Sequence, residues 1–190
     1  MRAKTSVQPV SAAEVADRLR AAGLTVRVVG DPSIMVHGLT HDSRTVRTGQ
    51  MFACLRGHLF DGHDYASQTV ADGASALLVD HELAGVGETA QLVVDDTRLA
   101  VGHASAIAWG DPSQHVTMIG ITGTNGKTTT AQIVAELLDA ADQPTGIIGT
   151  LHGLRTTPEA PELHAKLAEF VKQGKRAVVM EVSSHALALH

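Results

Sequence analysis

The stretch Ile119–Thr130, with the sequence IGITGTNGKTTT, determines how the rest of the chain is interpreted. An apolar run, Val116–Ile121, leads into Gly123, Gly126 and Lys127. After the lysine, apolar residues recur at three- and four-residue steps, which predicts a helix. A strand, a glycine turn and a helix in this order are typical of a phosphate site. Glycines allow successive backbone N–H groups to point into one hollow, and the helix N-terminus adds partial positive charge.

This loop predicts binding of ATP or GTP. Lys127 is expected to reach the outer phosphates, and the Thr128 hydroxyl to hold Mg²⁺. The match is to the short form G-x-x-G-K-T, because Ile121 stands where the longer pattern has its first glycine. A chance glycine-rich turn is the alternative, and the agreement of strand, loop, lysine and helix disfavours it. The predicted nucleotide-binding residues are Gly123, Thr124, Asn125, Gly126, Lys127, Thr128 and Thr129.

The helix after the loop is predicted to have one apolar face. The apolar residues recur at three- and four-residue steps, which places them on the same side of the helix. These residues are Ile133, Val134, Leu137, Leu138 and Ala141.

The composition excludes several classes of function. The formal net charge of −5 over 190 residues, with both signs interspersed, argues against a nucleic-acid or membrane-surface protein. No apolar run approaches the roughly 20 residues of a membrane span. Cys54 is the single cysteine and is expected to be a buried thiol. The eleven histidines have no Cys or His partners at zinc spacing, so most are expected at the surface. We expect a cytoplasmic, monomeric protein that acts on small molecules.

The first predicted domain covers residues 1–110. Ser11 and Glu14 form a capping box, so a helix should begin there and end at Gly23. The run Gly110–Ser113 breaks the last helix and marks the domain boundary. The other elements predicted here are strands at Val26–Val29, Ile34–Leu39, Met51–Leu55, Ala76–Val79 and Leu92–Val94, and helices up to Asp72 and from Thr97 to Trp109.

Within this domain, polar loops flank the strand Met51–Leu55. One loop contains Asp42-Ser43-Arg44 and the other Asp61-Gly62-His63. Loops of this kind held by a strand can form a small-molecule pocket. From spacing alone, a simple turn is the stronger interpretation of each loop.

The second predicted domain covers residues 115–190. A short apolar piece at Gly146–Thr150 precedes a helix with Pro161 in its first turn. Ala177–Val182 is a continuous apolar run, as in a buried parallel strand, and Glu181 lies near its carboxyl end. Ligands bind at that edge of open α/β sheets, so this acid can face a nucleotide's metal ion, although a local salt bridge or cap is the commoner role.

Four segments together resemble the Mur ligases of peptidoglycan synthesis, and in particular their tripeptide-forming (MurE) type, over its N-terminal portion. The segments are HDSRTVRTGQMFACLRGHLFDGH (41–63), GITGTNGKTTT (120–130), RTTPEAPEL (155–163) and MEVSSHAL (180–187). The phosphate loop is shared with folylpolyglutamate ligases, whereas the other three segments narrow the match.

The resemblance implies an α/β protein with a small mixed α/β domain that binds UDP-MurNAc-peptide, followed by the first part of a parallel-sheet ATPase domain. The implied reaction joins a diamino acid to UDP-MurNAc-L-Ala-D-Glu with ATP and Mg²⁺, through an acyl phosphate. It implies catalytic roles for Lys127 and Glu181, with Thr128 and Glu181 on Mg²⁺. The implied substrate-binding residues are Ser43, His58, Leu59, Phe60, Arg155, Thr156, Thr157 and Ser184.

Three other functions remain open on the sequence. They are another Mur or folylpolyglutamate-type ligase, a non-catalytic UDP-sugar or nucleotide-binding module, and a plain phosphate-loop NTPase that acts on partners. Because members of the resembling family continue well beyond the segment MEVSSHAL, we also expect that these 190 residues alone do not complete the ligation.

Overall fold

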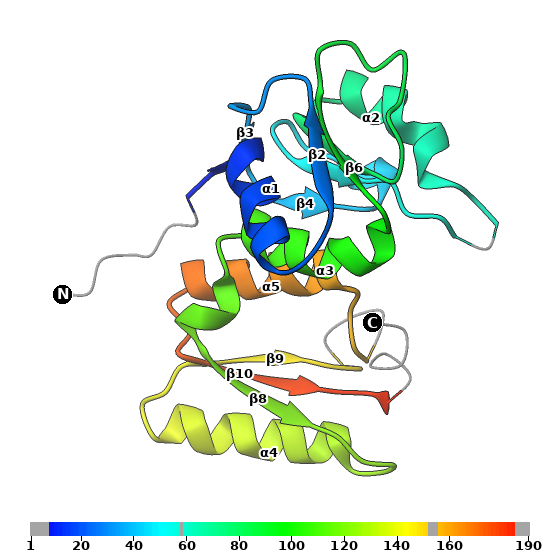
Figure 1. Cartoon of the computed structure of the whole chain (residues 1–190). Helices are drawn as coiled ribbons and strands as arrows, with labels where there is room; N and C mark the ends of the chain where they lie inside the picture. The colour runs from blue at the N-terminus through cyan, green and yellow to red at the C-terminus, as the bar shows by residue number, and fades with distance from the viewer. Residues whose placement is uncertain (1–7, 58, 152–155, 185–190) are drawn as a thin grey trace. The chain divides into compact units, whose positions relative to one another are not determined.

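The computed structural model describes residues 8–57, 59–151 and 156–184 (Figure 1). Two compact units are present, one from Gln8 to Gly110 and one formed by the described residues from Asp111 onward. Both are mixed α/β units built on a sheet with parallel strands. His58 and Arg155, two of the predicted substrate contacts, lie outside the described residues.

The first unit is built on a five-stranded sheet with the order β2-β7-β6-β5-β4. Strands β4 to β7 are mutually parallel, and β2 pairs antiparallel with β7. The carboxyl ends of the parallel strands therefore share one edge. The strands are β2 Val26–Val29, β4 Leu39–Thr40, β5 Met51–Ala53, β6 Ala76–Val79 and β7 Ala90–Val94.

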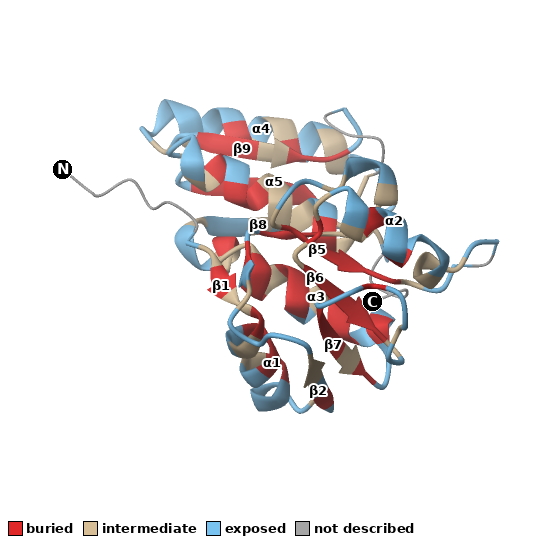
Figure 2. Ribbon diagram, turned by 90° about the horizontal axis from the view of Figure 1, so that it is seen from above, coloured by how far each residue is buried: buried red, intermediate tan, exposed pale blue. Residues whose placement is uncertain are grey.

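Both faces of this sheet are buried, which explains its continuous apolar strands. Side chains alternate between two cores: Met51 and Ala53 join one with helices α1 (Ala12–Ala21) and α3 (Thr97–Ala108). Phe52 joins the other, with helix α2 (Ala66–Ala71). Figure 2 shows β5 and β6 in the colour of buried residues, and β7 in the same colour except at one intermediate position.

The predicted single strand Ile34–Leu39 is wrong in detail. The chain forms β3 (Met35–Val36), which pairs antiparallel with β1 (Val10–Ser11), and then a separate β4. Gly38 divides them with φ +113°, and a Cβ there would approach the Trp109 ring to 2.6 Å. Only glycine fits this bend, and the bend is what passes the chain from one sheet to the next.

Local signals for the first helix and for the cysteine are confirmed. Ser11 Oγ accepts a hydrogen bond from Glu14 N at 3.1 Å, and Gly23 follows the helix with φ +90°. Cys54 is a buried free thiol, and burial raises its pKa to about 12. Among the described residues, no helix has the length and apolar character needed to cross a bilayer.

The second unit contains a parallel three-stranded sheet with the order β8-β10-β9. Helices α4 and α5 cover opposite faces of it (Figure 1). Leu167 and Phe170 of α5 pack on one side, and Ala131 and Ala135 of α4 on the other. The elements are a short 3₁₀ turn, η3 (Pro112–His115), then β8 Thr117–Ile121, α4 Lys127–Ala140, β9 Thr145–Ile148, α5 Ala160–Lys172 and β10 Ala177–Glu181.

The predicted apolar face of α4 is partly wrong. Val134 and Leu138 pack toward the sheet, but Ile133 and Leu137 are 52% and 65% exposed, and Ala141 is also exposed. The face that packs is completed instead by the alanines at 131 and 135. Small residues let the helix approach the sheet closely. They contribute less to the hydrophobic pattern of the sequence than the larger residues beside them, so the pattern did not indicate this face.

Candidate functional site: a phosphate loop and a buried glutamate

The phosphate loop joins the end of β8 to the start of α4. Gly123 and Gly126 have φ values of +144° and +78°, a region that favours glycine. Residues 122–126 are exposed. Within the described part of the chain, no side chain caps the N-terminus of α4. The first N–H groups of a helix need partners from outside it, so this end of α4 can accept an anion.

Lys127 lies across the loop. Its Nζ donates a hydrogen bond to the carbonyl oxygen of Gly123 at 2.8 Å. The bond holds the ammonium group beside the exposed backbone turn. A positive charge, glycine N–H groups and a helix N-terminus are thus assembled in one place.

Glu181 is the buried acid of this unit. It ends β10, is 2% exposed, and accepts hydrogen bonds at each carboxylate oxygen. Thr128 Oγ1 donates to Oε2 at 3.0 Å, and Thr150 N donates to Oε1 at 3.0 Å. A Cβ on Gly149 would come within 2.2 Å of Oε1, so the glycine makes room for the carboxylate. The sequence-predicted pair, Thr128 and Glu181, is therefore in direct contact.

Further hydroxyl groups surround this carboxylate. Thr157 Oγ1 donates to the backbone oxygen of Glu181 at 3.0 Å and accepts from Ser183 N at 3.0 Å. The hydroxyls of Thr156 and Thr150 lie 3.0 Å apart. Thr150 and Ser183 were missed by sequence reasoning, although both stand at or just beyond strand ends, where such residues gather. Ser184 is exposed beyond β10.

The Thr128–Glu181 pair fits a magnesium ion. Both groups offer hard oxygen ligands of the kind Mg²⁺ prefers. Their oxygens are 3.0 Å apart. Adjacent ligands of an octahedral Mg²⁺ with bonds of about 2.0–2.1 Å are separated by about 2.8–3.0 Å. These two residues could therefore become neighbouring ligands with little movement.

In the first unit, the Asp42-Ser43-Arg44 segment forms a turn after β4. Asp42 Oδ1 accepts from Arg44 N at 3.0 Å, and the Arg44 side chain bonds to both oxygens of Asp42. The hydrogen bond from the Arg44 side chain lowers the pKa of Asp42 to about 2, against a smaller opposing effect of burial. Ser43 begins the 3₁₀ turn η1 (Ser43–Thr45) and is half-buried.

The Asp61-Gly62-His63 segment forms a second turn after β5, capping η2 (Gly62–Tyr65). Asp61 Oδ1 accepts from His63 N at 3.0 Å. Just before it, Leu59 and Phe60 are 86% and 70% exposed. Large apolar side chains held in solvent at a sheet's carboxyl edge are available to stack on or enclose a ligand. Their role as substrate contacts stays a prediction.

A hollow that the sequence did not indicate lies at the ends of β6 and β7. Its volume is about 720 Å³. His63, whose side chain is 5% exposed, lies beside this region and is an exception to the surface position expected for most histidines. The hollow is lined by Arg56, Asp80, His81, Asp95, Asp96, Thr97 and Arg98.

Two family models match the chain one after the other. The model described as "Mur ligase family, catalytic domain" matches residues 35–108, and the one described as "Mur ligase middle domain" matches residues 121–190.

Curated relatives carry the name UDP-N-acetylmuramoyl-L-alanyl-D-glutamate--2,6-diaminopimelate ligase. The protein from Streptomyces coelicolor is 43% identical over 93% of this chain and 36% of its own length. The one from Geobacter sulfurreducens is 39% identical over 85% of this chain and 34% of its own length. The chain thus spans about a third of the length of the curated relatives it matches.

Solved structures of Mur ligases share the fold of this chain. A ligase structure with the same name superposes with a TM-score of 0.71 at 29% identity, covering 96% of this chain and 37% of that one. MurF from Acinetobacter baumannii gives a TM-score of 0.68 at 27% identity, covering 95% and 37%. The two family models, the sequence relatives and the shared fold lead to one conclusion: the chain belongs to the Mur ligase family.

Proposed function

We propose that this chain provides the UDP-sugar-peptide recognition unit and the ATP-phosphate site of a ligase that acts in peptidoglycan precursor synthesis. The ligase joins a diamino acid to UDP-MurNAc-L-Ala-D-Glu, and the names of the relatives favour 2,6-diaminopimelate as that amino acid. The single observation that carries the proposal is the contact between Thr128 and the buried Glu181 beside an exposed phosphate loop.

In this reaction a carboxylate oxygen of the D-glutamate residue attacks the γ-phosphorus of ATP and ADP leaves. The amine of the diamino acid then attacks the acyl phosphate and expels inorganic phosphate, forming an amide. Neither step needs a protein nucleophile. Phosphoryl transfer depends chiefly on positioning and on neutralising charge, and both are tasks for this phosphate loop.

The chain's own residues have distinct tasks in the proposal. The exposed N–H groups at Gly123–Lys127 hold the phosphates of ATP, together with Lys127, which exchanges its bond to Gly123 O for a phosphate oxygen. Thr128 and Glu181 hold Mg²⁺, which supplies charge neutralisation at the phosphates. The Thr150 amide keeps the Glu181 carboxylate in place.

The first unit is proposed to recognise the UDP-MurNAc part. Ser43 and the exposed Leu59 and Phe60 follow β4 and β5, at the carboxyl edge of the parallel strands, where open α/β sheets bind ligands. Thr156 and Thr157, which adjoin Glu181, are proposed to contact the MurNAc-peptide part.

Calorimetric titration of the 190-residue chain tests this function. We expect binding of both ATP with Mg²⁺ and UDP-MurNAc-L-Ala-D-Glu, with Ser43→Ala weakening only the second. Ser33→Ala, an exposed serine of the same unit, is the matched control and should change neither. Binding of ATP without any binding of the UDP-linked substrate would instead indicate a plain phosphate-loop NTPase.

A further inference from the structure

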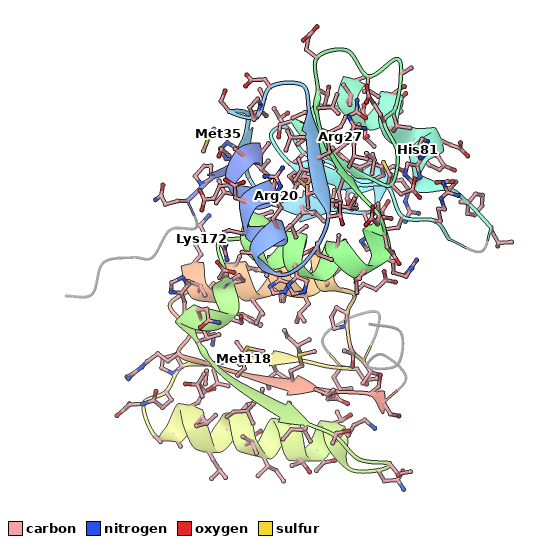
Figure 3. The ribbon with its side chains drawn as sticks, viewed as in Figure 1. Arg20, Arg27, Met35, His81, Met118 and Lys172 are labelled. Atoms are coloured by element: carbon pink, nitrogen blue, oxygen red, sulfur yellow. The ribbon has the colours of Figure 1, made fainter. Side chains whose placement is uncertain are left out.

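Two histidines and an aspartate converge at the carboxyl edge of the first unit's sheet. His63 comes from η2, whereas Asp80 and His81 directly follow β6. One potential ligand atom from each lies within 4.8 Å of the other two. His81, labelled in Figure 3, lies beside the cyan-green segment that carries His63, and the two imidazole rings stack with centroids 4.8 Å apart.

Each of the facing atoms can bind a metal ion through a lone pair, with His81 Nδ1 doing so in the tautomer that carries its proton on Nε2. His63 Nε2 lies 3.2 Å from Asp80 Oδ1, and His81 Nδ1 hydrogen-bonds to the same oxygen. Neighbouring ligands of a tetrahedral Zn²⁺ with bonds of about 2.0–2.1 Å are about 3.3 Å apart. The spacing of His63 and Asp80 is thus already close to the value that the ion requires.

A second carboxylate orients the buried histidine. His63 Nδ1 lies 2.5 Å from Asp61 Oδ1, so the Nδ1 proton is directed to Asp61 and the Nε2 lone pair faces Asp80. The amide of Asp80 also points at Nε2, at 3.4 Å, as expected when that nitrogen is an acceptor. A carboxylate that fixes the tautomer of a histidine is the usual outer partner of a metal-binding histidine.

Arg56 holds the two carboxylates together. Its Nε donates to Asp80 Oδ2 at 2.8 Å and lies 3.7 Å from Asp61 Oδ2, and its Nη2 donates to Asp80 Oδ1 at 3.3 Å. Asp80 Oδ1 therefore faces both the guanidinium and the two histidines, and a metal ion there would compete with the longer of these two bonds. Two carboxylates and one guanidinium give the cluster one net negative charge when the imidazoles are neutral. That balance favours a cation, and imidazole with carboxylate suits Zn²⁺ better than Mg²⁺.

Gly62 permits this geometry. A Cβ at that position would come within 2.7 Å of Leu55 N, so only glycine lets η2 lie this close to the end of β5. Asp61 and Arg56 also form an isolated bridge between the two arms of the loop. The backbone therefore holds the segment bearing His63 against the sheet edge, where β6 delivers its two ligands.

We propose that His63 Nε2, Asp80 Oδ1 and His81 Nδ1 bind a borderline divalent metal ion, with Zn²⁺ as the probe. Asp61 is a positioning residue for His63. Three protein ligands leave a fourth position on the ion, and because Asp80 and His81 also line the 720 Å³ hollow, that position opens to solvent there. This site lies in a different unit from the Thr128–Glu181 pair and does not depend on the proposed function.

Competition for Zn²⁺ between the 190-residue chain and a chromophoric chelator tests the proposal. Asp61→Asn should weaken Zn²⁺ binding by about 10–100-fold, as loss of an outer partner does, and His81→Ala by more, because it removes a ligand. His81 is 53% exposed at its side chain, so this variant is expected to fold. His103→Ala, an exposed histidine on α3, is the matched control and should bind like the parent.

The visible spectrum of the Co²⁺-loaded chain provides a second readout. The parent and His103→Ala should share one spectrum of a low-coordinate, imidazole-bound ion, and His81→Ala should lose it. If the parent and His81→Ala bind Zn²⁺ with equal affinity, or if Mg²⁺ competes at similar concentration, the proposed site is refuted.

Discussion

The carboxyl edges of the two sheets differ in which groups face a ligand. Beside β8 and β10 these groups are backbone N–H groups of an exposed turn, one lysine and a buried carboxylate. Beside β5 and β6 of the first unit they are charged side chains already paired with one another, Arg56 and Asp80 among them. Ligand binding at the first edge adds partners to the open backbone N–H groups and exchanges the single bond of Lys127, whereas at the second edge it must exchange existing ion pairs.

This difference has consequences for substitution. At the phosphate loop, Lys127 carries the positive charge. Loss of its side chain should therefore weaken ATP binding strongly and leave the free energy of unfolding unchanged. In the first unit, loss of one charged group leaves its partners with other contacts, so the effects on stability should be modest. Four predictions test the contrast, from the largest expected effect to the smallest.

Lys127→Ala should weaken ATP binding by about 10–150-fold, since a hydrogen bond to a charged group contributes about 1.5–3 kcal/mol and each 1.4 kcal/mol is a factor of ten. The free energy of unfolding should hardly change, because Lys127 bonds only to an exposed loop carbonyl among the contacts described. Titration with a fluorescent ATP analogue measures the affinity. Lys172→Ala, at the exposed end of α5, is the matched control (Figure 3). Equal affinities for the two variants would contradict the assigned role.

Gly149→Ala should lower the free energy of unfolding by about 1–3 kcal/mol, because the new methyl group displaces the Glu181 carboxylate from its hydrogen bonds. Urea denaturation measures the loss. Gly102→Ala in α3 meets no atom within 4 Å and should stabilise by about 0.5–1 kcal/mol. If Gly149→Ala is neutral, the carboxylate is not confined as described.

Thr157→Val should cost about 1 kcal/mol of stability, because it leaves Ser183 N without its described acceptor and removes a donor to Glu181 O. Hydrogen exchange at the Ser183 amide gives a local readout of the same bond and should accelerate. Unchanged exchange would show that this hydroxyl does not tie the segment to β10.

Acid should weaken the first unit through Asp42, by at most about 1 kcal/mol because the pair with Arg44 is exposed. The pKa of Asp42 is lowered in the folded state to about 2 from an ordinary 3.8, so its contribution is complete above about pH 4 and is lost as the pH falls toward 2. Urea denaturation between pH 6 and 2 should show a smaller acid loss for Asp42→Asn than for the parent. Parallel curves would contradict the assignment.

The glycine turn before α4 could be predicted from the sequence because its residues are adjacent in the chain. Gly123, Gly126, Lys127 and Thr128 form one turn, and their backbone angles follow from their identity. Glu181 was placed correctly at the end of a parallel strand by its apolar neighbours. Its contact with Thr128, 53 residues away, agrees with the rule that parallel strands end at one edge.

The histidine cluster could not be predicted in the same way. His63 and Asp80 are 17 residues apart and meet only because β5 and β6 are neighbours in register. Spacing rules for zinc sites search for ligands close in sequence, so they pass over such a set. The prediction of the apolar face of α4 was partly wrong for a related reason. The helix packs through Ala131 and Ala135, whose small side chains give a weak periodic signal in the sequence.

The Mg²⁺ dependence of ATP binding tests the central claim most directly. Calorimetry should show that Mg²⁺ tightens ATP binding to the parent chain and to Glu162→Gln, an exposed acid on α5. For Glu181→Gln, the account predicts that ATP alone binds as in the parent while the gain from Mg²⁺ disappears. An equal gain from Mg²⁺ in the parent and in Glu181→Gln would contradict the assignment of this buried carboxylate to the metal of a nucleotide site.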